Sequence, residues 1–470
     1  MRTRYLAVAL GVLTMGACKD ATRPDLNNPS VTDFSTITDR SQVQNLVTGV
    51  VRADRGQNES EIVFGETIGR DLYRITGSEP RWITEMLGES IDASDFLGQA
   101  MWGTEYAAIR LANIGVTGIN GADAAVLSDE EKQASLGVIR TMKALEYLRL
   151  IEVHDTTGAP INTDIDPTGD PAPLSCKGDV LAYVVSLLDS AAANLQAGGS
   201  EFPFTLPSGF AGFDDPAGFL KFNRALAAKA NVELAFRNYA KDGSIDKPYL
   251  TTAQTALTAS FMVRDAGKLE VGPFHTYSTN SGDATNGLFD ITIRANPRVV
   301  AEADAGDDRV TNKTTTTTTV SVGGDAPPQK VSSNVAYTLY DSPTAPVSIL
   351  TNKELLLLQA EIFWGQGDMT SAMDFANFIR TTDGGLTAKV GLIDSASVLN
   401  QILYEKRYSL LEQSGARWVD SRMFGRLNGS EPPAGVGKER GLDPLNNFPM
   451  AADEVVARNG NVSITSCTVN

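Results

Sequence analysis

The chain has 470 residues, of which 42% are hydrophobic and 21% are charged. This length exceeds one ordinary domain, provides a large core and suits a helical repeat array. The formal net charge is -17, so the chain repels phosphate backbones and anionic headgroups, and nucleic acid is not an expected partner.

The N-terminus has the pattern of a targeting signal. Arg2 and Arg4 precede an apolar run at 6–12, which is far shorter than the roughly 20 residues that span a bilayer. The run ends in Met15-Gly16-Ala17-Cys18, which resembles the lipobox of bacterial lipoproteins. The resemblance implies cleavage of a signal peptide at 1–17 and lipidation of Cys18. The alternative is an ordinary secretory signal with a chance cysteine.

A lipidated cysteine would be the only membrane anchor of this chain. Several acyl chains exceed the single chain that binds a membrane only marginally. Residues 18–33 are polar and are predicted to form a flexible tether. Lys19-Asp20 resembles the signal that sends lipoproteins to the outer face of the outer membrane, although Ala21 replaces the second acid that this signal usually has. The localisation expected is the outer membrane, exposed on the cell surface.

Two further cysteines, Cys176 and Cys467, follow in an exported chain. In an oxidising compartment they could form a disulfide that ties the C-terminal tail to the middle of the chain. The alternative is two separate buried thiols.

Apolar residues recur at helical spacing over most of the chain. A helix at 102–113 is expected to end in the glycine-containing region 115–121, and Ser128 begins an acidic, capped start to a helix through 138–148. Further helices are predicted at 179–195, 217–239, 252–261 and, as a pair joined by Gly365-Gln366-Gly367-Asp368, over 352–380. Alanines in these pairs allow close packing, as in tetratricopeptide repeats, but a strict 34-residue period is absent. The alternative is a generic alanine-rich bundle.

The composition changes between 263 and 349, where Gly, Asp, Thr, Asn and Pro predominate. The threonines at 314–319 and the segment 320–324 favour a short β-hairpin with long loops. Irregular loops on a rigid scaffold often carry binding function. The alternative is a disordered or decorative insertion.

The segment ILYEKRYSLLEQSGARWVDSRMFG at 402–425 interleaves charged and apolar side chains. It resembles the late helix of the SusD/RagB family of nutrient-uptake lipoproteins, with an acid-basic-basic start, a glutamate, a glycine, an arginine-tryptophan pair and an aspartate. The segments 142–154 and 355–380 resemble two other family helices, although the glycine and proline that usually follow the first come later here, as Gly158 and Pro160.

This resemblance implies a mainly α fold: a single SusD-like domain at 34–470, with a tetratricopeptide-like helical scaffold at about 100–262 and 350–425. The loop-rich region at about 263–349, with short β-hairpins, would face the ligand. The function implied is the capture of oligosaccharide, or a similar polymer fragment, and its delivery to a TonB-dependent outer-membrane barrel that grips the helical face.

The charged residues of the late segment are expected to form a structural network rather than catalytic machinery, because both signs alternate at helical spacing. This network comprises Glu405, Arg407, Glu412, Arg417, Trp418 and Asp420. His154 and His275, the only histidines, lack metal-ligand spacing, and no nucleophile or phosphate-loop motif occurs. Neither an enzyme, nor a cofactor, nor a metal is expected.

Sugar binding outside a membrane uses aromatic faces against C–H surfaces and planar polar groups against hydroxyls. The stretch RDLYRITGSEPRWITEM combines these types, and the irregular region supplies a second group. The candidate ligand-binding residues are Tyr73, Arg74, Arg81 and Trp82 in the first group and Phe274, His275 and Tyr277 in the second, with Glu79 and Phe289 beside them. Trp82 is equally compatible with a role as a core anchor.

Two other functions remain open at this point. A helical-repeat lipoprotein could scaffold the assembly of outer-membrane proteins, in which case the aromatic cluster near Trp82 would be buried or dispensable. A surface glycosidase would need two carboxylates at a defined separation in a cleft.

Overall fold

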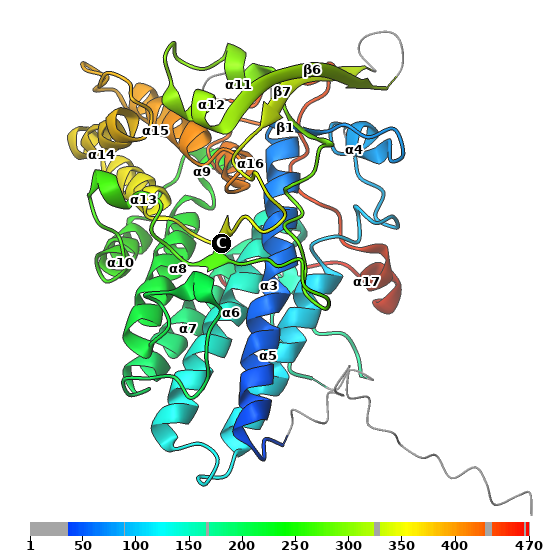
Figure 1. Cartoon of the computed structure of the whole chain (residues 1–470), viewed down its shortest axis with the longest axis vertical. Coiled ribbons are helices and arrows are strands. Elements are labelled where there is room, and N and C mark those ends of the chain that lie inside the picture. The colour runs from blue at the N-terminus through cyan, green and yellow to red at the C-terminus, as the bar shows by residue number, and fades with distance from the viewer. Residues whose placement is uncertain are drawn as a thin grey trace, which may run out of the picture.

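The computed structural model describes the chain over 36–88, 90–165, 169–323, 330–427, 435–464 and 467–469. The lipidation site and the tether lie outside these residues. Within them, the long helices pack against one another in sequence order, so that each long helix contacts the one before it (Figure 1). These helices are α3 (Arg40–Ile68), α5 (Gly103–Gly121), α6 (Asp129–His154), α7 (Lys177–Gln196), α8 (Pro216–Phe236), α10 (Lys247–Thr258), α13 (Asn352–Gln366), α14 (Met369–Thr382) and α15 (Ser395–Ser409).

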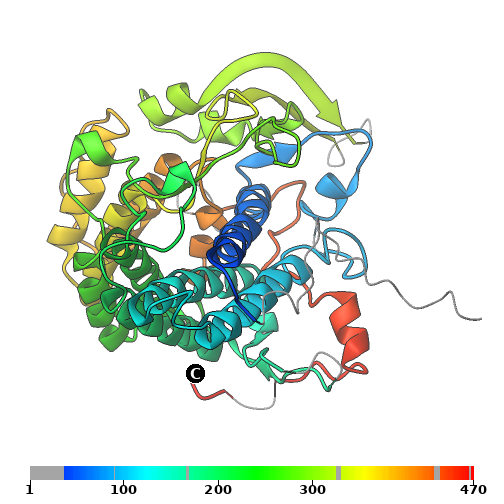
Figure 2. The same cartoon turned by 60° about the horizontal axis from the view of Figure 1, so that its bottom comes forward.

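This arrangement confirms the predicted fold class, a mainly α helical-repeat scaffold with short strand pairs. In Figure 2, α3 is seen nearly end-on, and the cyan, green and yellow helices form a curved layer around one side of it. One large apolar core runs through these helices, and a second lies between the C-terminal half of α3 and the loops that follow it. No described helix has both the length and the apolar character that crossing a membrane requires.

Local capping chemistry explains several helix ends. Ser128 and Glu131 form a reciprocal capping box at the start of α6, as the sequence predicts. Between α13 and α14, Gly367 has a φ of 95°, and Asp368 accepts the Ser371 N–H at 3.0 Å. These residues close one helix and open the next within two positions, which confirms the predicted pair.

Four helix predictions need correction. Helix α5 continues through to Gly121, because Gly115 is a packing position: a Cβ there would lie 3.0 Å from a Leu46 methyl group of α3. The segment 217–239 breaks after Phe236, and α10 begins five residues earlier than expected, at Lys247.

The fourth correction concerns the late segment at 402–425, which is not one helix. Helix α15 ends at Ser409, and α16 (Ala416–Met423) follows after a turn at 410–415. The break brings Gly415 against Gly65 of α3, where a Cβ on Gly65 would lie 2.8 Å from the Gly415 carbonyl oxygen.

The strands are short and antiparallel. The pair β6 (Thr314–Val322) and β7 (Val331–Tyr337) forms the predicted hairpin, with an irregularity between Thr316 and Val320. The other pairs are β1 (Leu72–Arg74) with β5 (Ile293–Ala295), β2 (Ala159–Pro160) with β3 (Leu174–Ser175), and β4 (Phe274–His275) with β8 (Val347–Ser348). Strand β1 thereby joins the chain after α3 to the loop-rich region.

Short helices complete the fold. They are α4 (Arg81–Thr84), α9 (Tyr239–Asp242), α11 (Arg298–Ala301), α12 (Asp308–Lys313), α17 (Ala452–Ala457) and three 3-10 turns at Asp155–Thr157, Ser208–Phe210 and Ala266–Lys268. Near the C-terminus, the structure brings Cys176 and Cys467 together with their Cα atoms 5.8 Å apart. Asp179 in the first turn of α7 accepts the Val469 N–H at 2.8 Å, so the tail is also held by hydrogen bonds.

Candidate functional site

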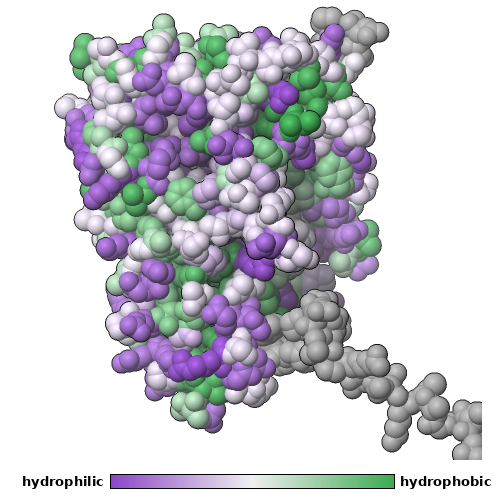
Figure 3. Space-filling view, in the orientation of Figure 1, coloured by the Kyte–Doolittle hydropathy of each residue, from purple (hydrophilic) through white to green (hydrophobic). Residues whose placement is uncertain are grey.

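An open cleft of about 340 Å³ lies between α3 and the segments that follow it. Helix α3 supplies Glu59, Ser60, Val63 and Phe64, the β1–α4 region supplies Arg74 and Trp82, and the loops supply Phe96, Ala100, Gly287 and Leu288. Figure 3 shows the face of the molecule that Figure 1 presents, where apolar (green) side chains gather beside α4 and the free end of the hairpin. The cleft therefore joins an aromatic wall to a few polar groups, a composition typical of small-ligand sites.

Two aromatic rings of the cleft differ in what they offer to a ligand. Trp82 is 6% exposed and stacks on Phe64, with ring centroids 5.7 Å apart. Phe96 meets Trp82 edge-on at 5.9 Å and is 44% exposed. Trp82 therefore anchors the wall in the core, and Phe96 presents the accessible ring.

Arginines cover part of these rings. The Arg74 guanidinium lies 4.8 Å from the centroid of the Trp82 ring and donates to Asp290 at 2.9 Å. Arg81 lies 4.7 Å from the centroid of Phe96 and pairs with Glu79 at 2.6 Å. Cation–π contact and ion pairing hold both guanidinium groups in place, so the aromatic wall is organised before any ligand arrives.

The polar groups of the cleft come mainly from α3. Glu59 accepts the Gly287 N–H at 3.1 Å, and Ser60 donates to the Gly56 carbonyl at 2.9 Å. The Glu59 carboxylate also faces Tyr277, but a carboxylate and a hydroxyl have more hydrogen-bonding capacity than these contacts use. Glu59 and Ser60 can therefore bind ligand hydroxyl groups.

Of the seven sequence candidates, the structure brings Arg74 and Trp82 to this cleft. Tyr73 precedes Arg74 in β1 and points to the opposite face, where it packs with Ile83 and Val331. Arg81 lies beside the cleft behind Phe96.

The second candidate group lies elsewhere. His275 is buried, and its Nε2 is 2.6 Å from Asp54, which also accepts from Arg149 at 2.7 Å. Phe274 is half-buried in the β4–β8 pair. Tyr277 is buried under Arg55, and burial together with the Glu59 carboxylate raises its pKa.

Eight of the ten residues that line the cleft were not among the sequence candidates. Four of these eight have a polar or aromatic side chain: Glu59, Ser60, Phe64 and Phe96. The first three lie on a helix whose buried face is partly polar. Phe96 stands in an Asp- and Gly-rich loop, and an aromatic residue in such a loop was the one signal that could have identified it.

The charged late segment packs in the interior, as a structural network would. Arg407 donates to Asp71 at 2.6 Å and to Glu302 at 2.7 Å. Arg417 pairs with the same Asp71 and donates to the Gly435 carbonyl at 3.0 Å. Two guanidinium groups thus share one buried carboxylate, which lies between α3 and β1. Burial raises the pKa of Asp71 to about 6, although Arg407 opposes the shift.

The remaining members of the segment pair with other helices and loops. Glu405 accepts from Arg309 at 2.6 Å and from Arg380 at 3.1 Å. The Trp418 indole N–H donates to the Leu445 carbonyl at 2.7 Å. Asp420 accepts from Lys406. Glu412 is also buried, and burial raises its pKa well above the usual range. These contacts position helices, and none of these charged residues is among the described residues that line the cleft.

Metal ligands do not cluster in the part of the chain that the structure describes, where no group of three His, Cys, Asp or Glu side chains could hold an ion. The sequence has two pairs of adjacent aspartates, Asp214-Asp215 and Asp307-Asp308, and one member of each pair acts in local structure. Asp215 caps α8 by accepting the Gly218 N–H at 2.7 Å, and Asp307 pairs with Arg309 at 2.6 Å.

Comparison with known proteins identifies the fold. No protein-family model and no curated protein matches the chain. A SusD superfamily protein from Parabacteroides distasonis ATCC 8503 is similar with a TM-score of 0.67 and 14% identity over 90% of this chain and 98% of that one. A SusD-like carbohydrate binding protein from Bacteroides fragilis NCTC 9343 gives 0.65 and 13% over 90% and 99%. A structure solved with a xylogluco-oligosaccharide gives 0.60 and 14% over 81% and 83%.

The chain therefore has the fold of the SusD superfamily. At these identities the likeness establishes the fold, and it confirms at that level the resemblance drawn from the sequence motifs.

Proposed function

We propose that this chain is a lipid-anchored binding protein that captures an oligosaccharide or similar polymer fragment in the cleft beside Phe96. It then delivers the ligand to a TonB-dependent outer-membrane barrel. The observation that carries the proposal is an exposed aromatic ring in an open cleft of a SusD-type fold.

Cleft chemistry supports a carbohydrate ligand. The Phe96 ring can cover the C–H face of a sugar, and Glu59, Ser60 and Arg74 can bond its hydroxyl groups. One structure with this fold is described as carbohydrate binding and another was solved with a xylogluco-oligosaccharide. Both observations favour a glycan over a purely apolar ligand.

Binding without bond cleavage fits the cleft better than hydrolysis does. Among its described lining residues, Glu59 is the only carboxylate. Glycoside hydrolysis generally needs two carboxyl groups flanking the scissile bond. A single acid held against the Gly287 N–H does not provide that pair.

The proposed anchor rests on a sequence motif, and the proposed partner rests on the helical scaffold. The lipobox-like Met15-Gly16-Ala17-Cys18 supports attachment to the membrane through Cys18. The SusD-like helical scaffold supports a barrel partner, since a rigid repeat surface suits broad protein contact. Purification of the native protein in mild detergent tests this part, with a large barrel expected in near-equal ratio. Recovery of periplasmic assembly components instead would favour the scaffolding alternative.

The ligand part of the proposal is tested by two phenylalanines of similar exposure. Phe96 is 44% exposed and lines the cleft, whereas Phe289 is 47% exposed and does not line it. Calorimetric titration with a panel of neutral oligosaccharides should identify a ligand. Phe96→Ala should then weaken binding about ten-fold or more, which corresponds to about 1.4 kcal/mol, and Phe289→Ala should leave affinity unchanged. Equal effects of the two variants, or no binding by any glycan, would overturn the cleft assignment.

A further inference from the structure

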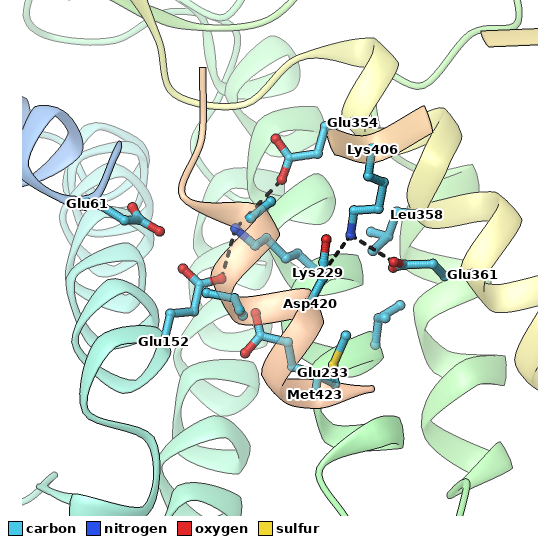
Figure 4. Close-up of a pocket in the computed structure, with 13 residues that line it drawn as sticks. Glu61, Glu152, Lys229, Glu233, Glu354, Leu358, Glu361, Lys406, Asp420 and Met423 are labelled. Atoms are coloured by element: carbon cyan, nitrogen blue, oxygen red, sulfur yellow. Dashed lines mark hydrogen bonds and ion pairs between the residues drawn. The ribbon is translucent and has the colours of Figure 1, made fainter. Parts of the chain in front are cut away.

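A small enclosed cavity lies at the point where α3, α6, α8, α13, α15 and α16 meet (Figure 4). Its volume is about 20 Å³, which is enough for one water molecule. The cavity is separate from the open cleft, and the proposed function does not use it.

Charged side chains of both signs surround this cavity, but acids predominate. Lys229 pairs with Glu152 at 2.8 Å and with Glu354 at 3.6 Å. On the other side, Lys406 donates at 2.8 Å to both Glu361 and Asp420 (Figure 4).

Two more acids complete the wall, Glu61 from α3 and Glu233 from α8. Behind Glu61, Arg149 of α6 bonds Glu61 and Asp54, and Asp54 also bonds His275. Among the described residues of the wall, Lys229 and Lys406 are the only cations for six carboxyl groups, and Arg149, which Glu61 shares with Asp54, acts on Glu61 from behind the wall.

Besides Glu152 Oε1, which forms an ion pair with Lys229 at 2.8 Å, three acid oxygens around the cavity have no hydrogen-bond partner among the described residues. They are Glu233 Oε1, Glu361 Oε2 and Asp420 Oδ2, all on buried side chains. An ionised, unpaired carboxylate in such surroundings is strongly unfavourable. Full ionisation of this cluster is therefore inconsistent with its burial, and its free oxygens need protons or water.

We propose that this interior cavity is a proton-binding site, in which carboxyl groups around one water molecule retain protons at neutral pH and release them to solvent as the pH rises. The water bridges the free oxygens of Glu233, Glu361 and Asp420. The two lysines stay charged and hold the remaining carboxylates.

The acid–base properties of the groups agree with this geometry. Burial raises the pKa of Glu61, Glu152 and Glu361 to about 7 in each case, against the opposing effect of the nearby basic groups. Burial lowers the pKa of Lys406, but Asp420 and Glu361 outweigh it and raise that pKa overall.

The direction of the pH dependence follows from these shifts. The folded pKa of Glu361 is about 7 and its ordinary value is 4.5. Between these values Glu361 binds more protons in the folded state than in the unfolded state. Its contribution to stability therefore falls as the pH rises through this window and does not change further above it. The site therefore favours the folded state on the acid side of neutrality.

The variant Glu361→Gln tests the proposal, because glutamine keeps the shape of the protonated acid and cannot titrate. Melting temperatures of wild type and variant are compared from about pH 5 to about pH 9, with the exposed Glu201→Gln as the matched control. We expect the variant to lose about 3 °C less than wild type between these limits, and Glu201→Gln to follow wild type. Parallel profiles of wild type and Glu361→Gln would overturn the proposal.

Infrared spectroscopy supplies a readout that a merely structural role would not change. At about pH 6, where exposed carboxyl groups are ionised, the spectrum of wild type minus Glu361→Gln should contain the carbonyl stretch of a protonated carboxylic acid. This band should decline as the pH passes about 7. Its absence at pH 6 would show that Glu361 is ionised and would refute the site. Glu152→Gln provides the same comparison if Glu361→Gln does not fold.

Discussion

The crossing of α3 and α16 depends on the absence of a side chain at Gly65, and Gly65→Ala should therefore destabilise the fold. A Cβ at this position would lie 2.8 Å from the Gly415 oxygen and 3.0 Å from its carbonyl carbon. Ordinary contacts between carbon atoms are about 3.5–4.0 Å, so the helices would have to separate by roughly 1 Å. The backbone atoms of Gly415 cannot rotate away as a flexible side chain could.

The magnitude can be bounded with a second glycine of the same helix. Overpacking of this kind costs about 1–3 kcal/mol. The exposed Gly56 has no atom within 4 Å of the position of its Cβ, so Gly56→Ala only gains the helix preference of alanine, about 0.5–1 kcal/mol. The same gain applies at Gly65. The difference in stability between the two variants therefore measures the cost of overpacking where α3 and α16 cross.

Thermal unfolding followed by circular dichroism measures this difference. An unfolding entropy of about 2.1 cal/mol/K per residue gives about 1 kcal/mol/K for a chain of this size, so 1 kcal/mol shifts the melting temperature by about 1 °C. We expect Gly65→Ala to melt about 1–3 °C below Gly56→Ala. The reasoning fails if Gly65→Ala melts at or above the temperature of Gly56→Ala.

Two further predictions concern covalent and ionic links in the interior. Cys176 and Cys467 should form a disulfide across 291 residues, so the intact mass of the native protein should increase by two hydrogens on reduction. An unchanged mass on reduction would indicate two free thiols. Cys176→Ser should lower the stability by at most about 6 kcal/mol in the chain-entropy account. In urea titrations, Asp71→Asn should lower the free energy of unfolding by about 3–5 kcal/mol, since it leaves two buried guanidinium groups without their shared carboxylate. The exposed Asp374→Asn should lower it by less than about 1 kcal/mol.

Local chemistry made part of the fold predictable from the sequence. The capping box at Ser128 and the glycine–aspartate turn between α13 and α14 involve neighbours within a few positions, so residue types alone indicate the helix ends. The break at 410–415 could not be found in this way. It accommodates the approach of Gly415 to α3, a contact across about 350 residues, and the sequence of the segment keeps its helical spacing through the turn.

The candidate site was predictable to the same extent. Arg74 and Trp82, which line the cleft, could be predicted because arginine and tryptophan are residue types that commonly contact sugars. His275 beside aromatic residues matched that description equally well. Its partner Asp54 lies 221 positions away, and only the folded arrangement shows that the imidazole is occupied by a buried ion pair.

Helix α3 explains why the middle of the molecule was the hardest part to predict. It lies outside the expected scaffold at 100–262 and 350–425. Its buried face has an apolar stripe in the N-terminal half, at Val43, Leu46, Val47, Val50 and Val51, which Asp54, Gln57, Asn58 and Glu61 then interrupt. The structure gives a physical reason. Within two turns, Glu61 faces the acidic cavity while Glu59, Ser60 and Phe64 line the open cleft on another side. The polar side chains that interrupt the apolar stripe of α3 therefore follow from the position of this helix between the open cleft and the acidic cavity.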